Sequence, residues 1–65
     1  AGCDPFHHAV TQFNRAQALM SMARDAEAAR AFGDAALGFE KCRRGANAVQ
    51  ARSLEEAASR RAGWP

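Results

Sequence analysis

One stretch of this 65-residue chain, residues 25–44, limits what the rest can form. Its apolar positions are spaced by four, three, four and three residues, which places them on one face of an α-helix. They are Ala28, Phe32, Ala35, Phe39 and Cys42. Acidic residues stand at the start of the stretch and basic residues at its end, the order that the helix dipole favours. We therefore predict an amphipathic helix over about residues 26–44, ended by Gly45, whose apolar face needs partners.

A second apolar stripe precedes this one. Asp4 and Pro5 provide a helix start, with the aspartate as cap and the proline at the first helical position. The stripe that follows has the same spacing and consists of Phe6, Val10, Phe13, Gln17 and Met20. We predict a first helix over about residues 5–23.

The two stripes can pack against each other. If the chain turns at Arg24-Asp25, the helices form an antiparallel hairpin. Its aromatic residues are then level in pairs: Phe6 with Phe39, and Phe13 with Phe32. No glycine or proline marks the turn, so one unbroken helix from Pro5 to about Arg30 is the alternative.

Two glycines interrupt the central helix. Gly33 and Gly38 each cost about 1 kcal/mol relative to alanine in a helix interior. Such a cost indicates either the close approach of another helix or a local bend.

The C-terminal segment carries a third, thinner stripe through Ala51, Leu54 and Ala58, and Gly63 ends it near Arg61. Alanine dominates the apolar residues, and isoleucine and tyrosine are absent, which favours helices over strands. We predict a single all-α domain, a small three-helix bundle made of an antiparallel helical hairpin plus a shorter third helix at about residues 47–61. The predicted core comprises Phe6, Val10, Phe13, Met20, Phe32, Phe39 and Leu54.

The hairpin also sets Cys3 level with Cys42. A disulfide between them would close a loop of about 40 residues and contribute about 4 kcal/mol of stability. Two unpaired thiols are the alternative. A bridged pair would indicate a periplasmic or secreted protein, and free thiols a cytoplasmic one. Ala1-Gly2-Cys3 also resembles the end of a bacterial lipobox, so a lipid anchor at Cys3 on a small lipoprotein subunit is a further alternative, whereas no apolar run reaches the roughly 18 residues of a membrane span.

The sequence offers no catalytic or metal-binding constellation. Cys3, His7 and His8 are the only cluster of metal-ligating residue types, and no acid or further cysteine follows at helical spacing to complete a zinc site. The serines lack a neighbouring histidine and acid for nucleophilic catalysis. We expect neither an enzyme nor a bound cofactor.

Several residues outside the stripes are candidates for contact with a partner. They are Leu37, Trp64, Arg43, Arg44, Arg60 and Arg61. Tryptophan is enriched at interfaces, and the arginines could form a basic patch for phosphate or an acidic protein surface. The net charge of +2 and the lack of interleaved aromatic residues favour a protein surface, and a dimeric nucleic-acid-binding regulator is the alternative.

Two families of helical modules resemble parts of this chain. A run of small and aromatic residues is similar to the packing positions of a tetratricopeptide repeat, although the large aromatic residue and the glycines of that repeat's first helix and turn are missing. The run is Ala16, Leu19, Ala23, Ala28, Ala31, Phe32 and Ala35. The positions Glu27, Ala28, Phe32, Ala35 and Phe39 are similar to the second helix of a MIT domain. Both resemblances imply a protein-binding module, such as a small accessory subunit, chaperone-like adaptor or inhibitor that binds a larger protein or its own copy.

Overall fold

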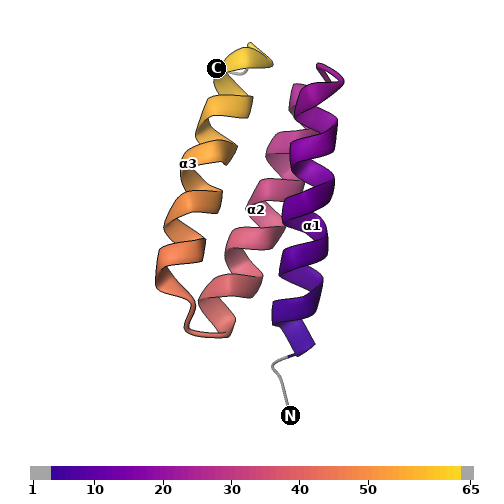
Figure 1. Cartoon of the computed structure of the whole chain (residues 1–65). Coiled ribbons are helices and arrows are strands. Elements are labelled where there is room, and N and C mark those ends of the chain that lie inside the picture. The colour runs from indigo at the N-terminus through magenta and orange to yellow at the C-terminus, as the bar shows by residue number, and fades with distance from the viewer. Residues whose placement is uncertain (1–3, 64–65) are drawn as a thin grey trace.

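The computed structural model describes residues 4–63, which form three α-helices and no strand (Figure 1). The helices are α1 (Asp4–Ser21), α2 (Asp25–Lys41) and α3 (Gly45–Arg61). α2 packs against α1 on one flank and against α3 on the other. The prediction of an all-α three-helix domain is confirmed. We expected α3 to be shorter, but it is as long as α2, at 17 residues.

The two interhelical turns share one backbone conformation. Ala23 and Arg43 both lie in the left-handed region, with φ of 60° and 58°. In the first turn the N–H of Arg24 donates to the carbonyl of Leu19 at 2.9 Å. In the second turn the N–H of Arg44 donates to the carbonyl of Phe39 at 2.8 Å. This is the hydrogen-bond pattern of a Schellman motif. Because α1 ends at Ser21 and α2 begins at Asp25, the alternative of one unbroken helix is wrong.

The role predicted for Gly45 is wrong, whereas that of Gly63 is confirmed. α2 ends at Lys41, Arg43 takes the left-handed position, and Gly45 is the first residue of α3. A residue other than glycine pays only about 1–2 kcal/mol in this conformation, which helix packing can offset. Gly63 has a φ of 77° and lies two residues after the end of α3, as Ala23 and Arg43 lie two residues after the ends of α1 and α2.

The core consists of small side chains. Ten of the thirteen buried apolar residues are alanines, and among residues 4–63 Phe32 is the one large side chain that is fully buried. A first group, here the Phe32 cluster, contains Ala16, Leu19, Ala28, Ala29, Ala31, Phe32 and Ala58. A second group, the Phe39 cluster, contains Ala9, Ala35, Ala36, Phe39, Ala48 and Ala51. The remaining predicted core residues are half-buried and pack against these clusters; they are Phe6, Val10, Phe13, Met20 and Leu54.

Four phenylalanines set the register of α1 against α2. The rings of Phe6 and Phe39 lie 5.9 Å apart, and those of Phe13 and Phe32 lie 5.5 Å apart, both edge to face. Phe13 also meets Phe39, at 6.2 Å. The first two contacts are the pairs that the hairpin predicts, so its register is confirmed.

Both helical glycines stand at close approaches. A Cβ added at Gly38 would lie 2.7 Å from Cβ of Ala9 and 2.9 Å from the carbonyl oxygen of Pro5, so α1 is nearly in backbone contact with α2 there. A Cβ added at Gly33 would lie 2.7 Å from Oε2 of Glu55 on α3. The predicted close approach of another helix is confirmed at Gly38, whereas at Gly33 the neighbour is the flexible end of the Glu55 side chain.

Candidate functional site: a groove between the outer helices

The two outer helices flank α2 without packing closely on each other. The backbones of α1 and α3 come within 8 Å of each other at almost no point, and in Figure 1 α2 lies behind them. An open groove of about 320 Å³ lies between them. Its lining comes from all three helices and consists of Gln17, Met20, Ser21, Phe32, Leu54 and Arg61. The groove is therefore a surface that α1 and α3 leave uncovered.

Large apolar side chains form the walls of this groove. Met20 on α1 and Leu54 on α3 are half-buried and pack against the Phe32 cluster from opposite sides, and Phe13 packs there beside them. Their inner atoms touch the core, and their outer atoms face water. No acidic residue lines the groove, and its polar side chains other than Arg61 are the neutral Gln17 and Ser21.

Arg61 stands at one end of the groove, called the Arg61 end. Its Nε lies 3.5 Å from Oδ1 of Asp25, a buried oxygen that accepts no hydrogen bond of good geometry. Asp25 is the first residue of α2, where the helix dipole favours a carboxylate. The ion pair ties the end of α3 to the start of α2, while the Arg61 side chain remains 54% exposed.

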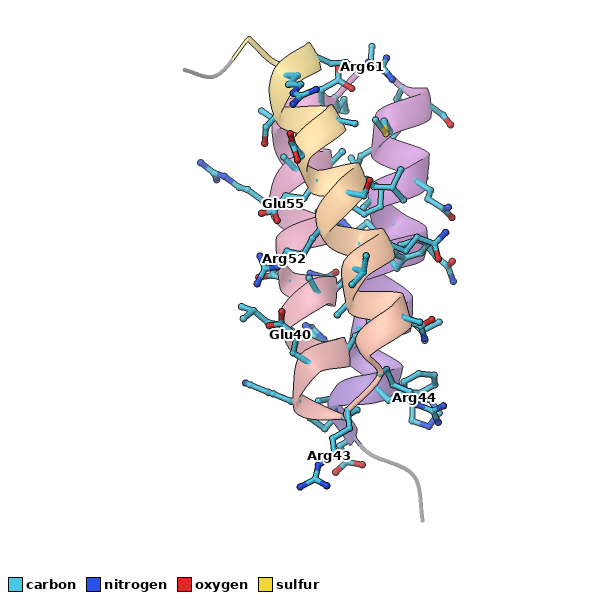
Figure 2. The ribbon with its side chains drawn as sticks, turned by 90° about the vertical axis from the view of Figure 1, so that its left-hand side faces the viewer. Glu40, Arg43, Arg44, Arg52, Glu55 and Arg61 are labelled. Carbon is cyan, nitrogen blue, oxygen red and sulfur yellow. The ribbon has the colours of Figure 1, made fainter. Side chains whose placement is uncertain are left out.

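Arg44 lies outside the lining of the groove, at the opposite end of the bundle, called the Arg44 end. The carbon at the centre of its guanidinium lies 4.8 Å from the centroid of the Phe6 ring, a cation–π contact between the α2–α3 turn and α1. Within residues 4–63, no acidic group lies within ion-pair distance of Arg43 or Arg44. Figure 2 shows both side chains at this end and Arg61 at the opposite end.

Among residues 4–63, Asp4 begins α1 at the Arg44 end and has no ion pair, whereas the other six acidic residues lie elsewhere and have partners. Arg52 on α3 contacts Oε1 of Glu40 at 3.5 Å and Oε1 of Glu55 at 3.1 Å, and Figure 2 shows this trio on the side away from Arg44. The hydrogen bond with Glu55 and the charge of Glu40 raise the pKa of Arg52 above its ordinary value. The trio links α2 to α3 outside the groove.

The other described carboxylates of α2 and α3 also have partners. Glu27 pairs with Arg24 at 3.0 Å, Glu56 pairs with Arg60, and Asp34 accepts a hydrogen bond from Gln12 at 3.3 Å. Most carboxylates of α2 and α3 are therefore already bound to groups of this chain and are not free to bind a partner.

The predicted basic patch of four arginines does not form. Arg44 and Arg60 are 16 residues apart on one helix, which separates them by about 24 Å. Arg60 and Arg61 also pair with Glu56 and Asp25, so the two arginine pairs differ in free charge as well as in position.

The other candidate contact residues are not part of the groove. Leu37 is 50% exposed, and because it precedes the buried Phe39 by two positions it lies on the opposite side of α2. Met22 and Val49 are exposed as well and were not singled out from the sequence. Trp64 lies outside the described residues.

The sequence did not reveal the groove, although it singled out two of its walls. Met20 and Leu54 were assigned to the core from their helical spacing, and Gln17 was noted only as a member of the first stripe. The one indication in the sequence is size: Met20 and Leu54 are much larger than the alanines that share their helical faces.

The metal and disulfide candidates extend beyond the described residues. Within residues 4–63, no group of three or more histidine, cysteine, aspartate or glutamate side chains could hold a metal ion. The predicted disulfide involves Cys3, which lies outside these residues, and it stays a prediction. Cys42 is half-buried directly after α2. Of the helices described here, none is long and apolar enough to cross a membrane.

Comparisons of the chain with models of protein families, with curated proteins and with solved structures found no match. The resemblances to tetratricopeptide repeats and MIT domains therefore stay predictions.

Proposed function

We propose that this chain is a non-enzymatic protein–protein interaction module that holds a helical segment of a larger protein in the groove between α1 and α3. The observation that supports this proposal is the row of half-buried apolar side chains, Phe13, Met20 and Leu54, that the two outer helices leave partly exposed. An amphipathic helix seated in an apolar groove is a recurring mode of recognition.

A helix suits this groove better than an extended strand. The groove runs between two helices and exposes side chains and no free backbone edge, so it has no row of N–H and C=O groups to pair with a strand. A helix could pack against both walls at the usual interaxial distance of about 8–10 Å. Small domains bury only a modest share of their surface, so a partner helix would also add to the stability of the fold.

The test uses an 18-residue amphipathic peptide with leucines on one face and neutral residues elsewhere. We expect this peptide to shift the NMR signals of Gln17, Met20 and Leu54 in the full chain, and to leave those of Leu37 unchanged. Leu54→Ala should weaken binding about tenfold, because truncating a leucine in an apolar contact costs on the order of 1.5 kcal/mol.

Leu37→Ala is the matched control. It makes the same chemical change on the opposite side of α2 and should leave the affinity unchanged. Circular dichroism of both variants establishes that they are folded. Shifts centred on Leu37, or equal losses of affinity in the two variants, would contradict the groove as the binding surface.

A further inference from the structure

We propose that the groove selects an acidic partner, namely an amphipathic helix that carries carboxylates at the end lying beside Arg43 and Arg44. This inference rests on the function proposed above and adds the chemistry of the partner. It follows from which arginines pair with carboxylates of the same chain and which do not.

The charge at the Arg44 end is positive, because Lys41, Arg43 and Arg44 outnumber Asp4, which begins α1 at the same end. Four other arginines have carboxylate partners: Arg24 with Glu27, Arg52 with Glu40 and Glu55, Arg60 with Glu56, and Arg61 with Asp25. Arg15 and Arg30, which have no ion pair within residues 4–63, lie outside the groove. Arg43 and Arg44 have none within residues 4–63. The face of the Phe6 ring orients the Arg44 guanidinium, whose N–H groups point along the guanidinium plane and suit a carboxylate.

The rest of the groove offers nothing to a basic helix. Its lining has no carboxylate, and Arg61 at the far end shares its charge with Asp25. A basic partner would meet like charge at both ends, whereas an acidic partner would be attracted most strongly at the Arg44 end. Such charge complementarity selects partners more than it adds affinity.

The distance between the two ends sets the length of the partner. Arg44 and Arg61 are 17 residues apart along α3, which corresponds to about 25 Å. A partner helix of about 17 residues would therefore extend from the groove beside Arg61, between α1 and α3, to the Arg44 end. Its apolar side would cover Phe13, Met20 and Leu54, and its acidic end would reach Arg44.

Three 18-residue peptides with the same leucine face test this inference on the full chain. One has three glutamates at one end, one has three lysines there, and one is neutral. We expect the glutamate peptide to bind about three- to tenfold more tightly than the neutral one, as a few exposed ion pairs would give, and the lysine peptide to bind more weakly. The advantage should shrink towards zero at about 1 M salt, where the Debye length is about 3 Å.

Charge-removing variants locate the effect. Arg43→Gln combined with Arg44→Gln should abolish the preference for the glutamate peptide. Arg15→Gln combined with Arg30→Gln removes the same charge from a depression between α1 and α2 outside the groove and should preserve the preference. Arg43→Gln alone keeps the contact between Arg44 and Phe6. It should already reduce the preference for the glutamate peptide, and it serves as a check in case the double variant does not fold.

The outcomes separate this inference from the proposed function. Equal binding of all three peptides would overturn the acidic selection and leave the groove as a binding surface. Failure of all three to bind would overturn the proposed function itself. Sedimentation that shows dimers, with shifted signals for Met20 and Leu54, would make a second copy of the chain the occupant and overturn the acidic partner.

Discussion

Alanine substitutions at the two glycines of α2 should have unequal effects on stability. Gly33→Ala and Gly38→Ala are the same chemical change in the same helix, five residues apart. In both cases the new methyl group would meet an atom at 2.7 Å. The neighbours differ, because Gly38 faces the backbone and Cβ of α1, whereas Gly33 faces the end of the Glu55 side chain.

The magnitudes follow from three contributions. Each substitution gains about 1 kcal/mol of helix propensity. At Gly38 the methyl group must push α1 away, and overpacking of this kind costs about 1–3 kcal/mol. At Gly33 the Glu55 carboxylate can rotate aside, at the loss of at most about 1 kcal/mol from its exposed pair with Arg52. Since the propensity gain cancels in the comparison, we expect Gly33→Ala to be the more stable variant by about 1–2 kcal/mol.

Urea denaturation followed by far-UV circular dichroism measures this difference. For a domain of this size, each 1 kcal/mol corresponds to roughly 4–8 °C in Tm, so thermal melts give an independent value. Ala9→Gly costs about 1 kcal/mol of helix propensity in either background, but it should lower stability less in the Gly38→Ala background, where it also removes the methyl group that the new side chain meets. Equal stability of the two alanine variants, or a more stable Gly38→Ala, would refute the close approach of α1 at Gly38.

Three further predictions concern the turns, the core and the cysteines. Ala23→Gly should stabilise the domain by about 1 kcal/mol in urea melts because it relieves the left-handed conformation, whereas Ala18→Gly inside α1 should destabilise it by about 1 kcal/mol. Phe32→Ala should cost about 3–5 kcal/mol in the same assay, because it empties the centre of the Phe32 cluster. If Cys3 and Cys42 form a disulfide, the intact mass should be lower by the two thiol hydrogens, and reduction should lower the free energy of unfolding by about 4 kcal/mol; an unchanged mass on reduction would contradict the bridge.

The hairpin was predictable from the sequence because two features agreed. Phe6 and Phe13 are seven residues apart, as are Phe32 and Phe39, so one antiparallel register brings both pairs together. Aromatic rings make edge-to-face contacts that few other registers would satisfy. The same register is the basis of the predicted pair of Cys3 and Cys42, which are three residues from Phe6 and Phe39 in the sequence.

The turn positions were harder to predict because local preference and packing disagree there. Gly45 is the obvious residue for a left-handed position, yet the structure places Arg43 in it. A penalty of about 1–2 kcal/mol at one residue is small beside the packing of two whole helices. Ala23 repeats the same conformation, so the turn geometry depends on how the helices meet and little on the residue.

The groove was not predictable from the sequence. Helical spacing shows which side chains share one face of a helix, but not whether another helix covers that face. Met20 and Leu54 lie on the inward side of their helices, as their spacing indicates. Whether two inward sides meet depends on the distance between α1 and α3, which no local pattern encodes. The separation of the two arginine pairs, by contrast, follows from the predicted third helix alone, because Arg43 and Arg44 precede it and Arg60 and Arg61 end it.

One feature of the composition connects the thin core to the groove. Alanine and glycine on the contact faces, such as Ala9 against Gly38, draw α1 and α3 tightly onto opposite flanks of α2. These close contacts leave room for few large side chains: Leu19, Phe32 and Phe39 are buried, whereas Phe13, Met20 and Leu54 remain half-buried. The same small residues therefore limit the stability of the isolated chain and create the apolar surface for a partner. A ligand that binds only the folded state raises its stability by mass action, so a helix bound in this groove would raise the free energy of unfolding by about 2.7 kcal/mol at one hundred times its Kd.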